Sequence, residues 1–267
     1  MTAAAARARR AGWAAFAITA GAMIATPLLP RGSRARAVLA DAVVGGLAAS
    51  VLAASVSRWG GRRAAAAGAA VAATTLAVER VGTRTGVPFG RYEYTAALQP
   101  QVAGVPVAVP AAWFAMALPS RAVAHRLLGA RSSMPARVVA GSALLAAWDL
   151  FLDPQMVGEG YWQWARSGRY RGIPGANYLG WFVTGLGVMA LLEVTTPPDG
   201  PPAGAAGADG APAGSVGADD ALTGLYAWMA VMSTLGFAVF FRDPIVALVG
   251  GSAMLPPAIA AVVQRHG

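Results

Sequence analysis

Long apolar runs, separated by short segments that contain arginine, constrain the fold of this chain more than any other feature of its sequence. A helix that crosses a bilayer needs about 20 predominantly apolar residues, and eight runs approach or reach that length. They cover residues 11–29, 37–57, 64–79, 102–118, 138–153, 177–193, 222–241 and 244–263. The pattern predicts an all-α, polytopic integral membrane protein with about eight transmembrane helices.

The composition supports this class. Hydrophobic residues make up 56% of the 267 residues and charged residues only 12%, with a mean hydropathy of +0.52. The formal net charge is +9, but the arginines lie in small groups between the apolar runs, as in membrane-flanking loops, and do not form a nucleic-acid interface. We therefore expect a multi-pass protein of the cell (plasma) membrane that lies in the lipid bilayer and binds no nucleic acid.

The chain divides into three parts by composition. Residues 1–194 form the predicted helical core. Residues 195–220 are dominated by Pro, Gly, Ala and Asp, and they have too few large apolar side chains to build a core, so they are predicted to be a disordered linker. Residues 221–267 are predicted to form a C-terminal transmembrane hairpin.

Two connectors of the core, residues 80–101 and 154–176, are rich in polar and aromatic side chains. The first belongs to the stretch ERVGTRTGVPFGRYEY, which begins at Glu79. Because one complete helical hairpin separates the third apolar run from the fifth, both runs leave the membrane on the same side. The two connectors are therefore expected to share one membrane face and to form one site.

Four carboxylic acids near this face are candidate catalytic residues: Glu79, Glu93, Asp149 and Asp153. The two aspartates are four residues apart, which places them on one face of a helix. Ionisable groups at membrane depth are costly and usually mark function, and a carboxyl at the edge of an apolar cavity can donate a proton near neutral pH. The alternative is that these acids only pair with arginines and hold the loops together.

A second set of side chains at this face comprises candidate substrate-binding residues. They are Arg84, Arg91, Tyr92, Tyr94, Trp148, Glu159, Tyr161, Trp162, Asn177, Tyr178 and Trp181. The aromatic members either form an interfacial belt, since Trp and Tyr favour the headgroup level, or line a pocket whose π faces stabilise a cation. His125 lies among arginines in an opposite connector and is expected to be a solvated loop residue.

Several enzyme classes are excluded by what the sequence lacks. Two histidines are too few for a membrane di-iron enzyme, and neither a P-loop nor a serine nucleophile elbow is present. The spacing of Asp149 and Asp153 fits the Mg²⁺-diphosphate motif of an intramembrane prenyltransferase or elongase, but no second aspartate-rich motif is evident. Acid chemistry on a lipid-soluble substrate is the interpretation that remains, with a transporter that has a polar gate as the non-enzymatic alternative.

Four segments resemble the CruF-type membrane carotenoid hydratases, a group of carotenoid biosynthesis proteins of bacteria and haloarchaea. They are ERVGTRTGVPFGRYEY at 79–94, QPQVAGVPVAVP at 99–110, WDLFLDPQMVGEG at 148–160 and YWQWARSGRYRGIPGANYLGW at 161–181. The resemblance extends over most of residues 76–193.

The resemblance implies a carotenoid 1,2-hydratase, a hydro-lyase of isoprenoid pigment synthesis that needs no cofactor. Such an enzyme adds water to the terminal (1′,2′) double bond of an acyclic carotenoid end and yields a tertiary alcohol. The implied substrate is a monocyclic C40 carotenoid, lycopene or a C50 carotenoid, and a carotenoid glycosyltransferase or desaturase is an implied downstream partner. A lycopene cyclase is the alternative within carotenoid synthesis, because it also protonates a carotenoid end but captures the cation with an internal alkene.

The chemistry that these residues can perform agrees with this implication. Protonation of a trisubstituted alkene gives a tertiary carbocation that a positioned water can capture, so the site needs an acid, an apolar tunnel and aromatic faces. Our hypothesis assigns the acid to Asp149 or Asp153. In it Glu79 and Glu93 position the water or act as alternative acids. Arginines 84 and 91 tune the charge of these carboxyl groups.

Overall fold

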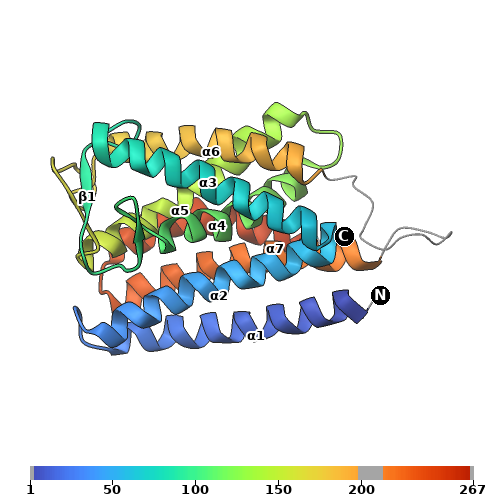
Figure 1. The fold of residues 1–267 in the computed structure, drawn as a ribbon, viewed down its shortest axis with the longest axis horizontal. Helices are drawn as coiled ribbons and strands as arrows, with labels where there is room; N and C mark the ends of the chain where they lie inside the picture. Colours follow the sequence, from blue (N-terminus) through green and yellow to red (C-terminus); the bar gives the residue numbers. More distant parts are fainter. Residues whose placement is uncertain (1–2, 198–212, 265–267) are drawn as a thin grey trace.

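The computed structural model describes residues 3–197 and 213–264, and side chains over 6–197 and 218–264. Its described part contains eight α-helices that form a bundle (Figure 1). They are α1 (Ala3–Ala25), α2 (Arg34–Trp59), α3 (Gly61–Thr85), α4 (Ala108–Leu128), α5 (Met134–Gly158), α6 (Gly175–Thr195), α7 (Ala213–Leu235) and α8 (Pro244–Val263). A 3₁₀ turn, η1 (Thr26–Leu28), follows α1, and a π-helical turn, η2 (Gly236–Phe240), follows α7. The predicted all-α class is confirmed.

Every helix except α4 contains a segment long and apolar enough to cross a membrane, so the described residues provide seven candidate spans. Successive helices run back and forth along the bundle, which places the start of α1 and the end of α8 at the end opposite strand β1 (Figure 1). Side-chain hydroxyls cap two of the helices, because Ser33 and Ser133 accept hydrogen bonds from the first-turn amides of α2 and α5. The chain is a multi-pass membrane protein of the helical type.

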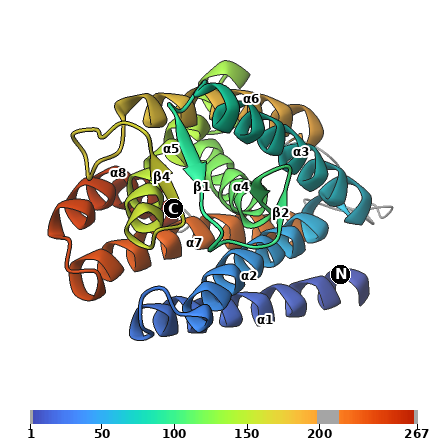
Figure 2. The ribbon, with the colours of Figure 1, turned by 60° about the vertical axis from the view of Figure 1, so that its left-hand side comes forward.

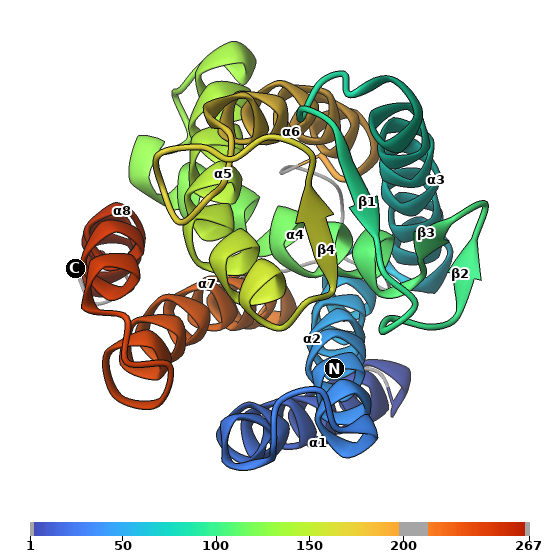
Figure 3. The same ribbon diagram turned by 90° about the vertical axis from the view of Figure 1, so that its left-hand side faces the viewer.

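Helix α4 differs from the span predicted at residues 102–118. The residues before it form a small hairpin of β2 (Gln101–Val102) and β3 (Val105–Pro106), and the helix continues ten residues beyond the predicted end, to Leu128. Arginine is a good helix former, and the arginines of this extension have carboxylate partners, so they do not end the helix. Helix α4 contacts α2, α3, α5, α6, α7 and α8, and it lies at the centre of the bundle (Figure 3).

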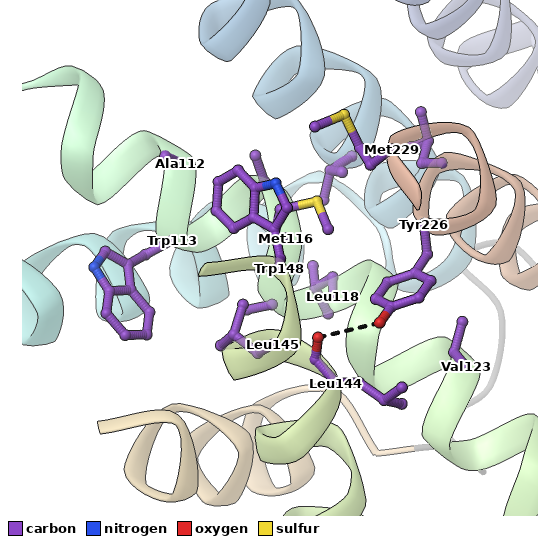
Figure 4. Packing of buried hydrophobic residues seen from close by; sticks show 14 of the residues in the cluster. Ala112, Trp113, Met116, Leu118, Val123, Leu144, Leu145, Trp148, Tyr226 and Met229 are labelled. Carbon is purple, nitrogen blue, oxygen red and sulfur yellow. Dashed lines mark hydrogen bonds between the residues drawn. The ribbon is translucent and has the colours of Figure 1, made fainter. Parts of the chain in front are cut away.

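Large apolar side chains of α4 form the core of the bundle with neighbours on α5 and α7 (Figure 4). Trp113 and Met116 of α4 are fully buried, and Trp148 of α5 belongs to the same cluster. Tyr226 of α7 is also fully buried, and its hydroxyl donates a 3.2 Å hydrogen bond to the carbonyl oxygen of Leu144. A buried tyrosine needs such a partner, so this bond fixes α7 against α5.

The two polar connectors meet at one end of the bundle, as the helix topology predicts. Strand β1 (Tyr92–Tyr94) of the first pairs antiparallel with strand β4 (Trp162–Trp164) of the second, with Glu93 opposite Gln163 (Figures 2 and 3). The amide of Thr95 continues the contact with a 2.9 Å bond to the carbonyl oxygen of Tyr161. The paired strands form a cover, which we call the lid, over the ends of α3, α4, α5 and α6.

A second polar cluster lies at the opposite end of the bundle and centres on Glu193 of α6. Its carboxylate accepts hydrogen bonds from Arg121 Nε at 2.8 Å and from Arg137 Nε at 3.0 Å, and it also contacts the ring of His125. The expectation that His125 is a solvated loop residue is therefore wrong. Helix α4 extends through His125, and the side chain of His125, 20% exposed, contacts the buried carboxylate of Glu193.

The C-terminal part of the linker predicted at residues 195–220 is helical. Residues 198–212 lie outside the described part of the chain, and α7 already begins at Ala213. Two acids that the sequence pattern assigned to the linker lie on this helix instead: Asp220 bonds Arg126 at 2.8 Å, and Asp219 lies 3.7 Å from Arg58. These ion pairs join the N-terminal part of α7 to α4 and α2.

Candidate functional site

A cavity of about 330 Å³ lies under the lid, between α3, α4, α5 and α6, and extends toward α1, α2 and α7. Its walls are mostly apolar and aromatic. Among the carboxylic acids of the described residues, Glu79, Asp153 and Asp41 line it, and the amide of Asn177 lies beside them. Few convergent polar groups in an otherwise apolar hollow are typical of a site for a small apolar ligand or part of one.

Glu79, near the end of α3, is held by three donors. Its Oε2 accepts a short hydrogen bond from the hydroxyl of Tyr92 and a 2.8 Å bond from the hydroxyl of Tyr94, and its Oε1 accepts a 3.0 Å bond from Trp113 Nε1. The lid supplies the two tyrosines and the central helix α4 supplies the tryptophan. The buried carboxyl is therefore fixed in orientation toward the cavity.

The tyrosines of the lid remain hydrogen-bond donors over the physiological range. Burial raises the pKa of Tyr92 and of Tyr94, and the negative charge of Glu79 raises both further. An ordinary tyrosine has a pKa near about 10, so a raised value keeps both phenols protonated at neutral pH. Each phenol thus presents its hydrogen to the Glu79 carboxyl.

Asp153, on α5, is held in a similar way by nitrogen donors. Its Oδ1 accepts bonds from Trp162 Nε1 at 2.6 Å and from Trp164 Nε1 at 3.2 Å, and its Oδ2 accepts a 2.7 Å bond from Asn177 Nδ2. Strand β4 brings both indoles over the helix end. The pairing of β4 with β1 therefore links the environment of Asp153 to that of Glu79.

Asp149 lies one turn before Asp153 and is completely buried. Its Oδ2 accepts a 2.6 Å bond from the same Asn177 Nδ2, as the four-residue spacing on one helix face allows. Its Oδ1 has no hydrogen-bond partner within the described structure. Asp149 is not among the residues that line the cavity, so it stands behind Asp153 and Asn177.

None of these three acids forms an ion pair with an arginine or histidine of the described residues. Instead, the buried acids with cationic partners lie elsewhere: Glu193 at the far end of the bundle, and Glu159, whose carboxylate is bonded twice at 2.6 Å by Arg36. Three buried carboxyl groups without a cation are costly to keep ionised. Such groups are typical of a site that handles protons.

Aromatic rings surround the acids. The rings of Trp113 and Trp181 are stacked, with centroids 3.9 Å apart and an interplanar angle of 12°, and Trp148 meets Trp181 edge-on at 6.1 Å. On the lid side, Tyr94 contacts Trp162 edge-on at 5.8 Å. All of these rings line the same cavity as Glu79 and Asp153, where they can stabilise a positive charge on a bound ligand.

The structure brings together most, but not all, of the residues predicted for the site. The predicted residues that line the cavity are Glu79, Tyr92, Tyr94, Trp148, Asp153, Tyr161, Trp162, Asn177 and Trp181. Tyr178 lies beside them on α6, with a buried hydroxyl that has no hydrogen-bond partner in the described structure. The predicted aromatic side chains other than Tyr178 therefore belong to the wall of a pocket.

Six predicted residues do not line the cavity: Asp149, Tyr178, Glu93, Arg84, Arg91 and Glu159. Glu93 alternates with Tyr92 and Tyr94 on strand β1, so its side chain is exposed on the outer face of the lid. Arg84 and Arg91 are also exposed, and neither pairs with a site acid in the described structure, so the expected tuning of charge by these arginines is not what the geometry provides. Glu159 instead anchors the end of α5 to α2 through Arg36.

Sequence reasoning missed many of the residues that line the cavity, among them Asp41 and Trp113. Asp41 is a partly buried carboxyl near the start of the apolar run 37–57, and a carboxyl inside such a run is rare enough to be a signal that could have identified it. Trp113 carries no such signal, because a single indole in an apolar run is equally typical of ordinary packing. Within the described residues no group of three His, Cys, Asp or Glu side chains is arranged to hold a metal ion.

The fold and the cavity define the class of this molecule as a polytopic helical membrane protein with buried acids at the inner end of an apolar hollow. The chain belongs to the family of carotenoid biosynthesis proteins, which matches residues 38–250. It is 33% identical over 134 residues to a protein of Haloarcula japonica named bisanhydrobacterioruberin hydratase. That match covers 49% of this chain and 45% of the relative, so the chain spans less than half of the relative's length. No solved structure matches the chain.

Proposed function

We propose that this protein is a carotenoid 1,2-hydratase, which adds water to the terminal double bond of an acyclic carotenoid end and forms a tertiary alcohol. The observation that carries the proposal is the placement of two acids from different helices, Glu79 and Asp153, on one apolar cavity walled by tryptophans. The family, and the name of the relative as a hydratase, support a carotenoid substrate. The reaction is not a redox reaction, so its atoms balance with alkene and water alone.

Asp153 is the proton donor in this proposal. Asp149 and Asp153 share one amide donor, Asn177, and two carboxylates so placed repel each other, which favours a proton on the pair. Only Asp153 lines the cavity, so the proton leaves the pair through it. It adds to the alkene carbon that carries one hydrogen, and the positive charge falls on the carbon that carries two methyl groups.

The aromatic wall and Glu79 complete the reaction. The faces of Trp113, Trp181 and Trp162 stabilise the tertiary cation. A water molecule then forms the new carbon–oxygen bond and gives its extra proton to the Glu79 carboxylate, which three donors hold in place. Asp153 ends as a carboxylate and Glu79 ends protonated, and proton transfer through water restores both.

Asp149 and Asn177 act through Asp153 and are positioning residues. The amide of Asn177 holds Asp153 Oδ2 at 2.7 Å and ties it to Asp149 at 2.6 Å. This arrangement fixes the acid on the cavity wall, so that its proton is aimed at the bound alkene. The membrane that houses the protein is, in this proposal, the cell membrane, and a glycosyltransferase or desaturase can use the new alcohol downstream.

The experiment that tests the proposal is mass-resolved pigment analysis of cells that make lycopene, γ-carotene or a C50 carotenoid and express this chain. The expected result is a more polar pigment heavier by one water in at least one strain. Glu79→Gln and Asp153→Asn should each abolish this pigment while the protein still reaches the membrane. A pigment of unchanged mass with a shifted spectrum would mean cyclisation and would contradict hydration.

A further inference from the structure

The cavity is open on one side. Four apolar residues that line it are also exposed on the outside of the molecule: Ile24 (49%), Leu235 (49%), Val239 (59%) and Phe240 (46%). They come from the end of α1 and from α7 with its π-helical turn η2. We call the gap that these side chains surround the mouth.

The mouth lies beyond the point where α1 contacts α7. These two helices touch through Phe16 and Trp228, whose rings meet edge-on with centroids 5.2 Å apart. About two turns further along each helix, at Ile24 and Leu235, both helices line the cavity instead. The opening is therefore bounded by two helices that an aromatic contact joins about two turns away.

The mouth faces lipid. Residues Ala6–Leu28 and Ala218–Phe240 are both candidate membrane spans, and all four side chains that surround the mouth lie in them. Exposed apolar side chains in a membrane span contact the hydrocarbon of the bilayer. A ligand that passes between them therefore reaches the buried acids from the side, without crossing water or the lid.

The size of the cavity decides how much of a ligand it can hold. Its volume of about 330 Å³ is at the lower end of the roughly 300–1,000 Å³ of pockets that enclose drug-sized molecules. A C40 or C50 hydrocarbon is much larger than such a ligand. Only one end of it fits beside Glu79 and Asp153, and the remaining chain must run out through an opening that is itself apolar.

Gly236 keeps this opening clear. It is the first residue of η2, a π-helical turn closed by a 2.9 Å bond from the amide of Phe241 to the carbonyl oxygen of Gly236. Turns of this type are frequent at functional sites. Gly236 lines the cavity, and a Cβ added there would meet only the Phe241 ring, at 3.9 Å, which is ordinary van der Waals contact. A larger side chain at 236 can thus occupy the mouth without a backbone clash.

We infer that the site takes one unreacted end of a long linear hydrocarbon sideways from the bilayer, through the mouth between α1 and η2. Gly236 sets the width of that mouth. The reaction that follows rests on the proposed function, but the route of entry does not, because binding of pigment can be measured without turnover. A molecule with two unreacted ends would leave and re-enter in the opposite orientation for a second reaction.

The test is a size series at the mouth: Gly236→Ala, Gly236→Leu and Gly236→Trp. The matched control is Gly224→Trp, a glycine of α7 that is exposed, does not line the cavity and has no atom within 4 Å of an added Cβ. Each protein is purified in detergent from pigment-producing cells, and bound carotenoid per protein and hydrated pigment per cell are measured. Gel filtration and thermal unfolding establish that each variant is folded.

The expected result is a stepwise loss with side-chain size, tenfold or more for Gly236→Trp, while Gly224→Trp matches the wild type. Equal pigment binding and hydration by Gly236→Trp and Gly224→Trp would overturn the inferred route. If Gly236→Trp does not fold, Gly236→Leu at wild-type levels would overturn it equally. Wild-type protein that binds carotenoid without hydrating it would contradict the proposed function alone, and wild-type protein that does neither would contradict both.

Discussion

The Nδ2 atom of Asn177 lies 2.6 Å from Asp149 Oδ2 and 2.7 Å from Asp153 Oδ2, so a single amide of α6 bridges two acids of α5. All three side chains are buried. The bridge orients one carboxyl toward the cavity and keeps a second one behind it. A like-charged pair in this position is a means of retaining a proton inside an apolar site.

Replacement of the bridging amide by an apolar side chain of similar size, Asn177→Leu, should lower hydration strongly. Two buried carboxyl oxygens would lose their donor, and an unsatisfied buried polar group costs about 1–3 kcal/mol. If the same free energy is added to the activation barrier because Asp153 is no longer oriented, the rate falls roughly 10-fold to 100-fold. Pigment conversion and pigment binding should be measured together, since a positioning role lowers conversion while binding stays close to wild type. Loss of binding alone would contradict it.

The two aspartates should differ when each is replaced by its amide. Asp153→Asn removes the group that lines the cavity and should cost about 10²–10⁴-fold, the usual contribution of a general acid. Asp149→Asn leaves the acid on the cavity wall and changes only the group behind it, so activity should fall less than in Asp153→Asn. The rate of hydration in detergent is the measurement. A variant Asp153→Asn that keeps full activity would reassign the acid.

The length of the apolar runs was enough to locate the helices, because a helix that crosses the bilayer needs a minimum apolar length whatever its tertiary contacts are. Counting the helices also placed the two connectors at one membrane face, because an even number of membrane crossings separates them. Helix α4 shows the limit of this reasoning. Its last turns carry Arg121 and Arg126, whose partners Glu193 and Asp220 come from distant parts of the chain, so the pattern ended the helix at residue 118.

The sequence alone could place the acids of the site at one membrane face. It could not show which of them point into the cavity, because that depends on the alternation of side chains along a strand. Tyr92 and Tyr94 point to Glu79 while Glu93 points outward, because residues 92–94 form a strand. That strand exists only because it pairs with residues 162–164, far along the chain. The ion pair of Glu159 with Arg36 is equally non-local, so its anchoring role could not be inferred from its neighbours.

The lid tyrosines should make the protein sensitive to alkali. Burial raises the pKa of Tyr92 and Tyr94 in the folded state, whereas an unfolded tyrosine ionises near about 10. The stability that each contributes is thus fully present below about pH 10 and is lost as pH rises further, by about 1.4 kcal/mol per pH unit per tyrosine. Thermal unfolding in detergent from pH 8 upward should show this loss, with a shallower slope for Tyr92→Phe. An identical slope would mean that the phenol is not protected.

Gly180 should tolerate no side chain. A Cβ there would lie 2.6 Å from Phe89 Cδ1 and 2.9 Å from the carbonyl carbon of Pro88, which is backbone and cannot move aside cheaply. Gly180→Ala should therefore displace the loop that carries Tyr92 and lower both stability, by about 1–3 kcal/mol, and hydration. Gly187→Ala, on the exposed face of the same helix with no atom within 4 Å, is the control and should be neutral or slightly stabilising. Unfolding temperature and pigment yield decide the comparison.

The far-end cluster should affect stability without affecting chemistry. Glu193→Gln leaves Arg121 buried without its carboxylate, together with Arg137 and His125, and breaking a buried pair in this way costs about 3–5 kcal/mol. The unfolding temperature should drop markedly, while hydration per folded molecule, measured below that temperature, should equal that of the wild type. Glu193 lies at the opposite end of the bundle from the lid, so a loss of activity in a fully folded variant would show that the two ends are coupled and that the cluster is not only structural.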